Sequence, residues 1–230
     1  YSVFDEKRYF SPGRKFLFLD LDGMALGTSI CGDIWIKKGF VIEKQAQLGA
    51  RLNINLSASP YYANKIQERI DLLKEQASRF DTYISYVNLV GGQDEIVFDG
   101  GSMVIDPAGK IIAAAKQFKE DLLIVDIPRK NLQAKLPSVK ANYYHVPIEL
   151  KKKNRAPYLN RVKKFYKNEG EIYQALLLGT RDYIFKTSFQ NVVVGLSGGI
   201  DSALTATIAV DALGKENVKA IFMPSPYTTA

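Results

Sequence analysis

The chain has 230 residues, an apolar fraction of 47%, one cysteine and a net charge of +7. This apolar fraction is enough for a packed core in one or two domains, while a single cysteine excludes an internal disulfide framework. No apolar run is long enough to span a bilayer and no signal-peptide pattern opens the sequence. The single cysteine fits a reducing, cytoplasmic setting, and we expect a cytoplasmic protein. Much of the basic excess lies between residues 130 and 167, which favours a basic surface over a nucleic-acid site.

Residues 16–127 mix short apolar runs with two helical stretches, which predicts an α/β layered domain. The runs that predict strands are residues 16–21, 25–31, 52–59, 82–90, 102–116 and 122–127, with a turn at "DPAGK" inside the fifth. One helix is expected at about residues 40–49. A second has Ile66, Ile70, Leu73 and Ala77 on one face. We therefore expect a sheet sandwich with helices outside.

From residue 128 to residue 168 the pattern breaks into prolines, tyrosines and lysines, and we expect a linker there. The next stretch, 171–189, predicts a helix with an apolar stripe formed by Ile172, Leu176, Gly179 and Tyr183. After it come a buried parallel-type strand, an apolar helix and another strand, at residues 190–196, 201–214 and 218–226. This order predicts the βαβ unit of a nucleotide-binding domain.

The string SGGIDS, residues 197–202, lies between a predicted strand and a predicted helix. Glycine allows the backbone to approach a ligand closely, and the first N–H groups of a helix attract anions. Ser197 and Ser202 can donate to phosphate oxygens, and Asp201 becomes compatible with phosphate when Mg²⁺ lies between them. A plain glycine turn with Asp201 and Ser202 as helix caps is the alternative. The whole string after an apolar strand favours the phosphate site.

SGGIDS resembles the pyrophosphatase loop of ligases that cleave ATP to AMP and pyrophosphate, and the string from Gly195 to Ala230 is similar to glutamine-dependent NAD synthetases. It lacks the Gly-Lys-Ser/Thr ending of a Walker loop. The resemblance implies that ATP phosphates are held by Gly195, Ser197, Gly198, Gly199, Asp201 and Ser202. It also implies that Asp201 holds Mg²⁺ and that Met223 lies near the adenine.

Cys31 ends the predicted strand in "SICGDIW". An isolated cysteine is more often a small buried side chain, but a thiol at a strand end can attack a carbonyl if its pKa is lowered. Asp33 and Trp35 follow at the spacing of the nucleophile strand in the nitrilase superfamily, as in the glutaminase domain of NAD synthetases. The resemblance implies a Glu-Lys-Cys triad in which Cys31 forms a thioester with the substrate glutamine.

The resemblance covers nearly the whole chain and is weakest in the linker. In "YSVFDEKRYFSPG" it implies that Tyr1 contacts substrate and that Glu6 is an additional glutamate that orients the catalytic site. In "NLSASPYYANK" it implies that Ser57 and Ser59 contact bound glutamine. The sequence departs from the family at position 32, where Gly32 replaces a common glutamate and puts glutamine affinity in question.

The catalytic lysine and the base glutamate of the triad are expected upstream of Tyr1. Lys7 and Lys15 do not match the position of that lysine, and we interpret both as surface residues. The chain is therefore expected to be a fragment that is inactive alone.

The fold implied is a nitrilase-like αββα sandwich at residues 1–127, a linker at 128–168, and at 169–230 the start of a Rossmann-like domain of the adenine nucleotide alpha hydrolase type. The implied reaction converts deamido-NAD, ATP and glutamine to NAD, AMP, pyrophosphate and glutamate, in a homo-oligomer with no nucleic-acid or membrane partner. One alternative is an inactive glutaminase beside a purely ammonia-dependent ligase, or a binding or assembly role. Two others are a different ammonia-using ligase and a stand-alone carbon–nitrogen hydrolase, which would lack SGGIDS.

Overall fold

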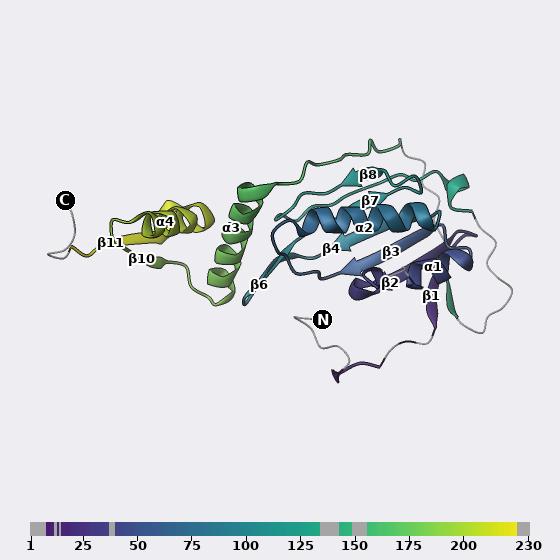
Figure 1. The fold of residues 1–230 in the computed structure, drawn as a ribbon, viewed down its shortest axis with the longest axis horizontal. Coiled ribbons are helices and arrows are strands. Elements are labelled where there is room, and N and C mark those ends of the chain that lie inside the picture. The colour runs from purple at the N-terminus through teal and green to yellow at the C-terminus, as the bar shows by residue number, and fades with distance from the viewer. Residues whose placement is uncertain are drawn as a thin grey trace.

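The computed structural model describes residues 8–11, 13, 15–36, 40–133, 143–148 and 156–224. A seven-stranded mixed sheet forms the larger unit (Figure 1). Its strands follow the order β8-β7-β4-β3-β2-β1-β9, and the pairs β2–β3, β3–β4 and β1–β9 are parallel. Their bounds are β1 (Phe16–Leu21), β2 (Ala25–Ile30), β3 (Leu52–Ser57), β4 (Tyr83–Asn88), β7 (Met103–Ile105), β8 (Ile111–Ala114) and β9 (Tyr143–Ile148).

Two helices, α1 (Phe40–Gln47) and α2 (Lys65–Arg79), cover one face of this sheet. The stripe predicted on α2 is buried, and it packs against Ile84 and Tyr86 of β4 and against Met103 and Ile105 of β7. The apolar spacing of three and four residues explains this, because it puts every member on one side of the helix. The turn predicted at "DPAGK" is also present, with the N–H of Gly109 donating to the oxygen of Asp106 at 2.9 Å.

The opposite face of the sheet is apolar and partly exposed. Side chains alternate between the two faces of a strand, so residues next to the buried ones point away from α1 and α2. The residues exposed on this face include Ile30, Leu56, Val87, Tyr144 and Val146. A four-layer αββα sandwich needs a second sheet against such a face. The described residues thus form one α/β half of the predicted sandwich.

A short hairpin, β5 (Val90–Gln93) and β6 (Ile96–Asp99), lies between β4 and β7 along the chain and forms a separate two-stranded sheet. Helix α3 (Asn168–Lys186) packs against it. Beyond α3 lie β10 (Val192–Leu196), α4 (Ile200–Leu213) and β11 (Val218–Phe222), and β10 is parallel to β11. The predicted βαβ unit is therefore confirmed. Helix α3 stands between this unit and the large sheet (Figure 1).

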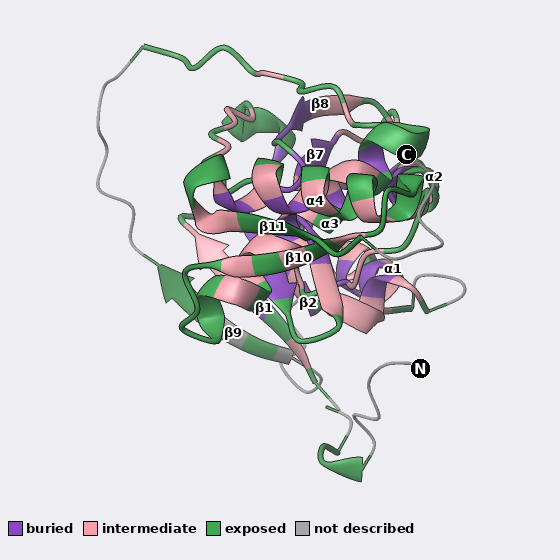
Figure 2. Cartoon of the chain, turned by 90° about the vertical axis from the view of Figure 1, so that its left-hand side faces the viewer, coloured by how far each residue is buried: buried purple, intermediate pink, exposed green. Residues whose placement is uncertain are grey.

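The βαβ unit is less buried than the large sheet, as the exposed colours of α4, β10 and β11 show (Figure 2). On α4 the buried residues are Ala209 and Leu213, although the helix is apolar along most of its length. Among the described residues, no helix is both long and apolar enough to cross a bilayer.

Three sequence predictions about secondary structure need correction. Residues 122–127 form no strand. Their segment is instead tied to the chain at 158–161 by carboxylates, since Asp126 accepts from the N–H of Tyr158 and Asp121 accepts from Arg161. The run at 82–90 ends at Asn88, and Val90 already belongs to the hairpin. Strand β9 lies inside the predicted linker and pairs with β1, which local sequence patterns do not reveal.

The stripe predicted on α3 is not its buried face. Ile172, Leu176 and Tyr183 are exposed, whereas the buried residues are Glu171, Ala175 and Leu178. The reason is that α3 packs against the hairpin and the loop around Phe118. This contact selects the face of the helix that is covered.

Candidate active site and phosphate loop

Cys31 begins a short 3-10 helix, Cys31–Ile34, directly after β2. Its φ of 39° lies in the left-handed region, which non-glycine residues rarely adopt and which is frequent at functional sites. The carboxylate of Asp33 accepts from the N–H of Ile30 at 2.8 Å, and the N–H of Trp35 donates to the oxygen of Gly32. These bonds hold the turn that presents a free, partly exposed thiol.

Lys65 is a residue of this site that sequence reasoning missed. It starts α2, its ammonium donates to the oxygen of Pro60 at 2.6 Å, and it lies 5.6 Å from the centroid of the Trp35 ring. Burial lowers the pKa of Lys65, while Cys31 is among the neighbouring groups that oppose this shift. An ammonium within electrostatic reach of a thiol stabilises negative charge on sulfur. The string "YYANK" contained this lysine but carried no local signal for it.

The serines predicted to contact glutamine lie at the end of β3. Because β2 and β3 are parallel with Ile30 opposite Leu56, Cys31 and Ser57 leave neighbouring strands at the same edge. The N–H of Ser59, a buried residue, donates to the side-chain oxygen of Asn88 at 2.9 Å. The structure thus brings the Cys31 turn and the Ser57–Lys65 segment together.

Tyr86 adds a buried hydroxyl, which has no hydrogen-bond partner among the described residues. Burial raises the pKa of Tyr86, and the charge of Arg69 and the hydroxyls of Ser57 and Ser59 oppose this shift. A separate cavity of about 480 Å³ adjoins Ser57, Leu56 and Val87, and Cys31 is not in its lining.

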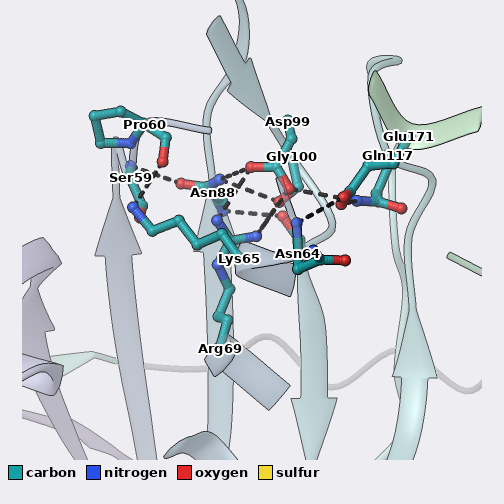
Figure 3. A network of polar contacts seen from close by, with 11 residues as sticks. Ser59, Pro60, Asn64, Lys65, Arg69, Asn88, Asp99, Gly100, Gln117 and Glu171 are labelled. Carbon is teal, nitrogen blue, oxygen red and sulfur yellow. Dashed lines mark hydrogen bonds and ion pairs between the residues drawn. The ribbon is translucent and has the colours of Figure 1, made fainter. Parts of the chain in front are cut away.

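A buried ion pair lies next to the segment that carries Ser59 and Lys65. Arg69 of α2 and Asp99 of β6 are fully buried, and two guanidinium nitrogens of Arg69 each lie 3.1 Å from an oxygen of Asp99. The side-chain nitrogen of Asn88 donates to the carbonyl oxygen of Gly100 at 3.1 Å and lies 3.3 Å from Asp99 (Figure 3). Since Asn88 also accepts from Ser59, the ion pair and the serine segment share one network.

Two residues of the predicted glutaminase site, Tyr1 and Glu6, lie outside the described residues, as does the predicted surface residue Lys7. Lys15 lies 5.1 Å from the ring centroid of Tyr144, at the edge formed by β1 and β9. That position agrees with its interpretation as a surface residue.

The loop at residues 197–202, predicted to bind phosphate, is held by hydrogen bonds of its own hydroxyl groups. The oxygen of Ser202 accepts from the N–H of Ser197 at 3.2 Å and donates to the carbonyl of Gly199 at 3.0 Å. Gly198 has a φ of +85° and open space where a side chain would be, and Gly199 precedes the first turn of α4. The N–H of Gly199 also donates to the hydroxyl oxygen of Ser197 at 3.4 Å, so hydroxyls of the loop accept from two of its N–H groups. The first turn of α4 begins directly after Gly199, and the first turn of a helix attracts anions.

Gly195 and Met223 lie side by side at the edge of the βαβ unit. A side chain at Gly195 would meet the terminal methyl of Met223 at 3.2 Å. Because β10 and β11 are parallel with Leu196 opposite Phe222, Met223 leaves its strand where the loop leaves β10. The residues predicted to bind ATP therefore lie together, at the ends of β10 and β11 where the loop begins.

Asp201 is exposed in the first turn of α4, beside the hydroxyls of the loop. Within the described part of the chain, no cluster of three His, Cys, Asp or Glu residues forms a closed metal site. Mg²⁺ fits this arrangement, because it usually takes one or two protein carboxylates and fills its other positions with water and substrate phosphates.

Comparisons with known proteins match both parts of the chain. The carbon–nitrogen hydrolase family matches residues 2–135 and the NAD synthase family matches residues 172–230. The chain is 44% identical to a glutamine-dependent NAD(+) synthetase of Aquifex aeolicus and 42% identical to one of Thermotoga maritima. All of the chain is aligned, but it spans only 42% and 41% of those relatives.

A solved structure agrees over the same length. The glutamine-dependent NAD+ synthetase of Acinetobacter baumannii, in complex with ADP, superposes on 100% of the chain with a TM-score of 0.82 and 40% identity. The chain covers 39% of that protein.

Proposed function

The chain belongs to the carbon–nitrogen hydrolase family, and on that premise we propose that it is the part of a glutamine-dependent NAD synthetase that joins the glutamine-hydrolysing site to the ATP-using domain. The observation that carries this proposal is the presence, in one chain, of a thiol turn at a strand end and the loop at Ser197–Ser202. An amidase alone has no need of the second, and an ammonia-dependent ligase has no need of the first.

At the first site, the sulfur of Cys31 attacks the side-chain amide carbon of glutamine and releases ammonia. Water then cleaves the thioester, so that glutamate leaves and the thiol is restored. Lys65 supplies positive charge close to the sulfur, and Ser57 and Ser59 orient the substrate. Tyr1 and Glu6 contribute to the pocket in this proposal.

At the second site, the carboxylate of deamido-NAD is adenylated by ATP with release of pyrophosphate, and ammonia then displaces AMP to give NAD. Backbone N–H groups and serine hydroxyls of the loop hold the ATP phosphates, and Met223 contacts the adenine. Mg²⁺ held by Asp201 would neutralise phosphate charge. Ammonia passes between the sites inside the protein, because ammonium in bulk water is not a nucleophile.

The two family matches support domains close to residues 1–127 and 169–230, with β9 returning from the intervening segment to the first sheet. We propose a cytoplasmic protein that acts on small molecules, forms a homo-oligomer in its whole form and binds neither nucleic acid nor membranes.

We expect Asp201→Ala in the whole protein to lower NAD formation from ammonia by roughly a hundredfold, because the transition state loses the metal that offsets phosphate charge. The measurement is the steady-state rate with saturating ammonium and Mg²⁺. Glutamate release from glutamine should continue. Asp211→Ala is the matched control, since Asp211 lies near the other end of the same helix. Equal ammonia-dependent rates in Asp201→Ala and wild type would reduce the loop to a structural turn.

A diverged glutaminase is the second candidate function, and Gly32 is the observation that favours it. If a carboxylate at this position contacts the substrate, Gly32→Glu should lower the KM for glutamine about tenfold, the contribution of one charged hydrogen bond. Gly32→Gln, of similar size but neutral, is the control. Wild-type protein that uses ammonia but releases no glutamate from glutamine would establish the second candidate.

A further inference from the structure

Glu171 is a buried carboxylate at the start of α3, with 1% of its surface exposed. One of its oxygens accepts from the backbone N–H of Asn64 at 2.9 Å, and the other accepts from the side-chain nitrogen of Gln117 at 3.2 Å (Figure 3). Burying a carboxylate is costly unless its oxygens are satisfied. Both oxygens of Glu171 are therefore occupied by these two hydrogen bonds, and both bonds join α3 to residues of the larger unit.

The first contact holds the residue that precedes Lys65. Asn64 has a φ of 68°, which is left-handed, and its side chain makes no capping bond to α2. Asparagine adopts this conformation more readily than most residues, because its short polar side chain tolerates it. The carboxylate of Glu171 is the group that fixes the N–H of Asn64 here. Because Lys65 follows Asn64 directly, the same bond fixes the backbone from which the Lys65 side chain extends toward the carbonyl oxygen of Pro60 and toward Cys31.

The second contact reaches the serine segment. Gln117 lies between Glu171 and Asp99, at 3.2 Å and 3.4 Å, and its oxygen accepts from the N–H of Tyr166 at 2.8 Å. Asp99 in turn is bonded to Asn88, which accepts from the N–H of Ser59. Hence both ends of the segment from Ser59 to Lys65 are connected to a single side chain of α3.

We propose that Glu171 is a positioning residue for the amide-hydrolysing site: from α3 it fixes the segment that carries Ser59 and Lys65 beside Cys31. This inference rests on the proposed function and deepens it. Glu171 touches neither the thiol nor the substrate in this arrangement, so it acts through geometry.

The test compares Glu171→Ala with Glu169→Ala in the whole protein. Both changes remove one carboxylate from the first turn of α3, but Glu169 is exposed. We expect Glu171→Ala to raise the KM for glutamine about tenfold, as for the loss of one hydrogen bond to a charged group, while ammonia-dependent NAD formation changes less than about twofold. Glu171→Gln keeps an oxygen that can accept from Asn64, and should recover most of the wild-type KM.

A second measurement does not depend on glutamine. Amide hydrogen exchange in residues 59–65 should become about tenfold faster in Glu171→Ala, and remain as in wild type in Glu169→Ala. Equal exchange and equal KM in these two variants would overturn the positioning role, while glutamine use by wild type would leave the proposed function standing. Faster exchange in a protein that never hydrolyses glutamine would support the positioning contact and refute the proposed function. If Glu171→Ala does not fold, Glu171→Asp decides, because its shorter side chain cannot reach both Asn64 and Gln117 from α3. A positioning role predicts faster exchange and a raised KM for Glu171→Asp, and wild-type values would overturn it.

Discussion

Cys31→Ala in the whole protein should lose glutamine-dependent NAD formation by roughly ten-thousandfold or more, the usual effect of removing a catalytic nucleophile. The ammonia-dependent reaction should keep its wild-type rate, because the proposed ATP site at residues 197–202 lies between β10 and α4, on a different unit from the thiol. The measurement is NAD formation with glutamine and with ammonium as alternative donors. Selective labelling of Cys31 by a glutamine-like electrophile such as diazo-oxo-norleucine should accompany it.

The matched control for this prediction is Asp201→Ala, which should give the reverse pattern. Together the two variants separate donor hydrolysis from ATP use. Glutamine-dependent activity that survives in Cys31→Ala would contradict the glutaminase assignment, because the 230 residues contain no second cysteine to replace it.

Arg69→Met should lower the free energy of unfolding by about 3–5 kcal/mol, because it leaves the buried carboxylate of Asp99 without its partner. In the wild-type protein burial opposes the charged form of Arg69, but the pairing with Asp99 outweighs this and holds the pKa of the guanidinium above its ordinary value. The measurement is the free energy of unfolding in urea, taken from the transition in which the seven-stranded sheet unfolds.

Arg51→Met is the control for this second prediction. Arg51 forms an ion pair with Asp81 at 2.9 Å, but the two side chains are 42% and 77% exposed, so its loss should cost less than about 1 kcal/mol. The double variant Arg69→Met with Asp99→Leu should recover much of the lost stability, since no unpaired buried charge remains. Equal losses in Arg69→Met and Arg51→Met would show that the buried pair has no special weight.

Features that depend on neighbouring residues were predictable from the sequence. The apolar stripe of α2, the turn at Asp106–Gly109 and the strand–loop–helix order around Ser197 are all present. Each of these features depends on a spacing of a few residues or on a glycine at a bend, so the local sequence is enough to predict it. The position of Cys31 at the end of β2 belongs to this group, because the strand and the turn after it are consecutive.

Features that join distant residues were decided only by the tertiary structure. Strand β9 pairs with β1 across more than a hundred residues, the ammonium of Lys65 lies 5.6 Å from the ring centroid of Trp35 just after the Cys31 turn, and Glu171 bonds to Asn64. No periodic pattern in the sequence indicates these pairs. Each pair forms because packing of the sheet and helices brings distant residues together. For the same reason the apolar stripe predicted on α3 did not reveal which side of the helix is buried: amphipathic spacing shows that a helix has an apolar side, while packing against β5 and β6 decides which side is covered.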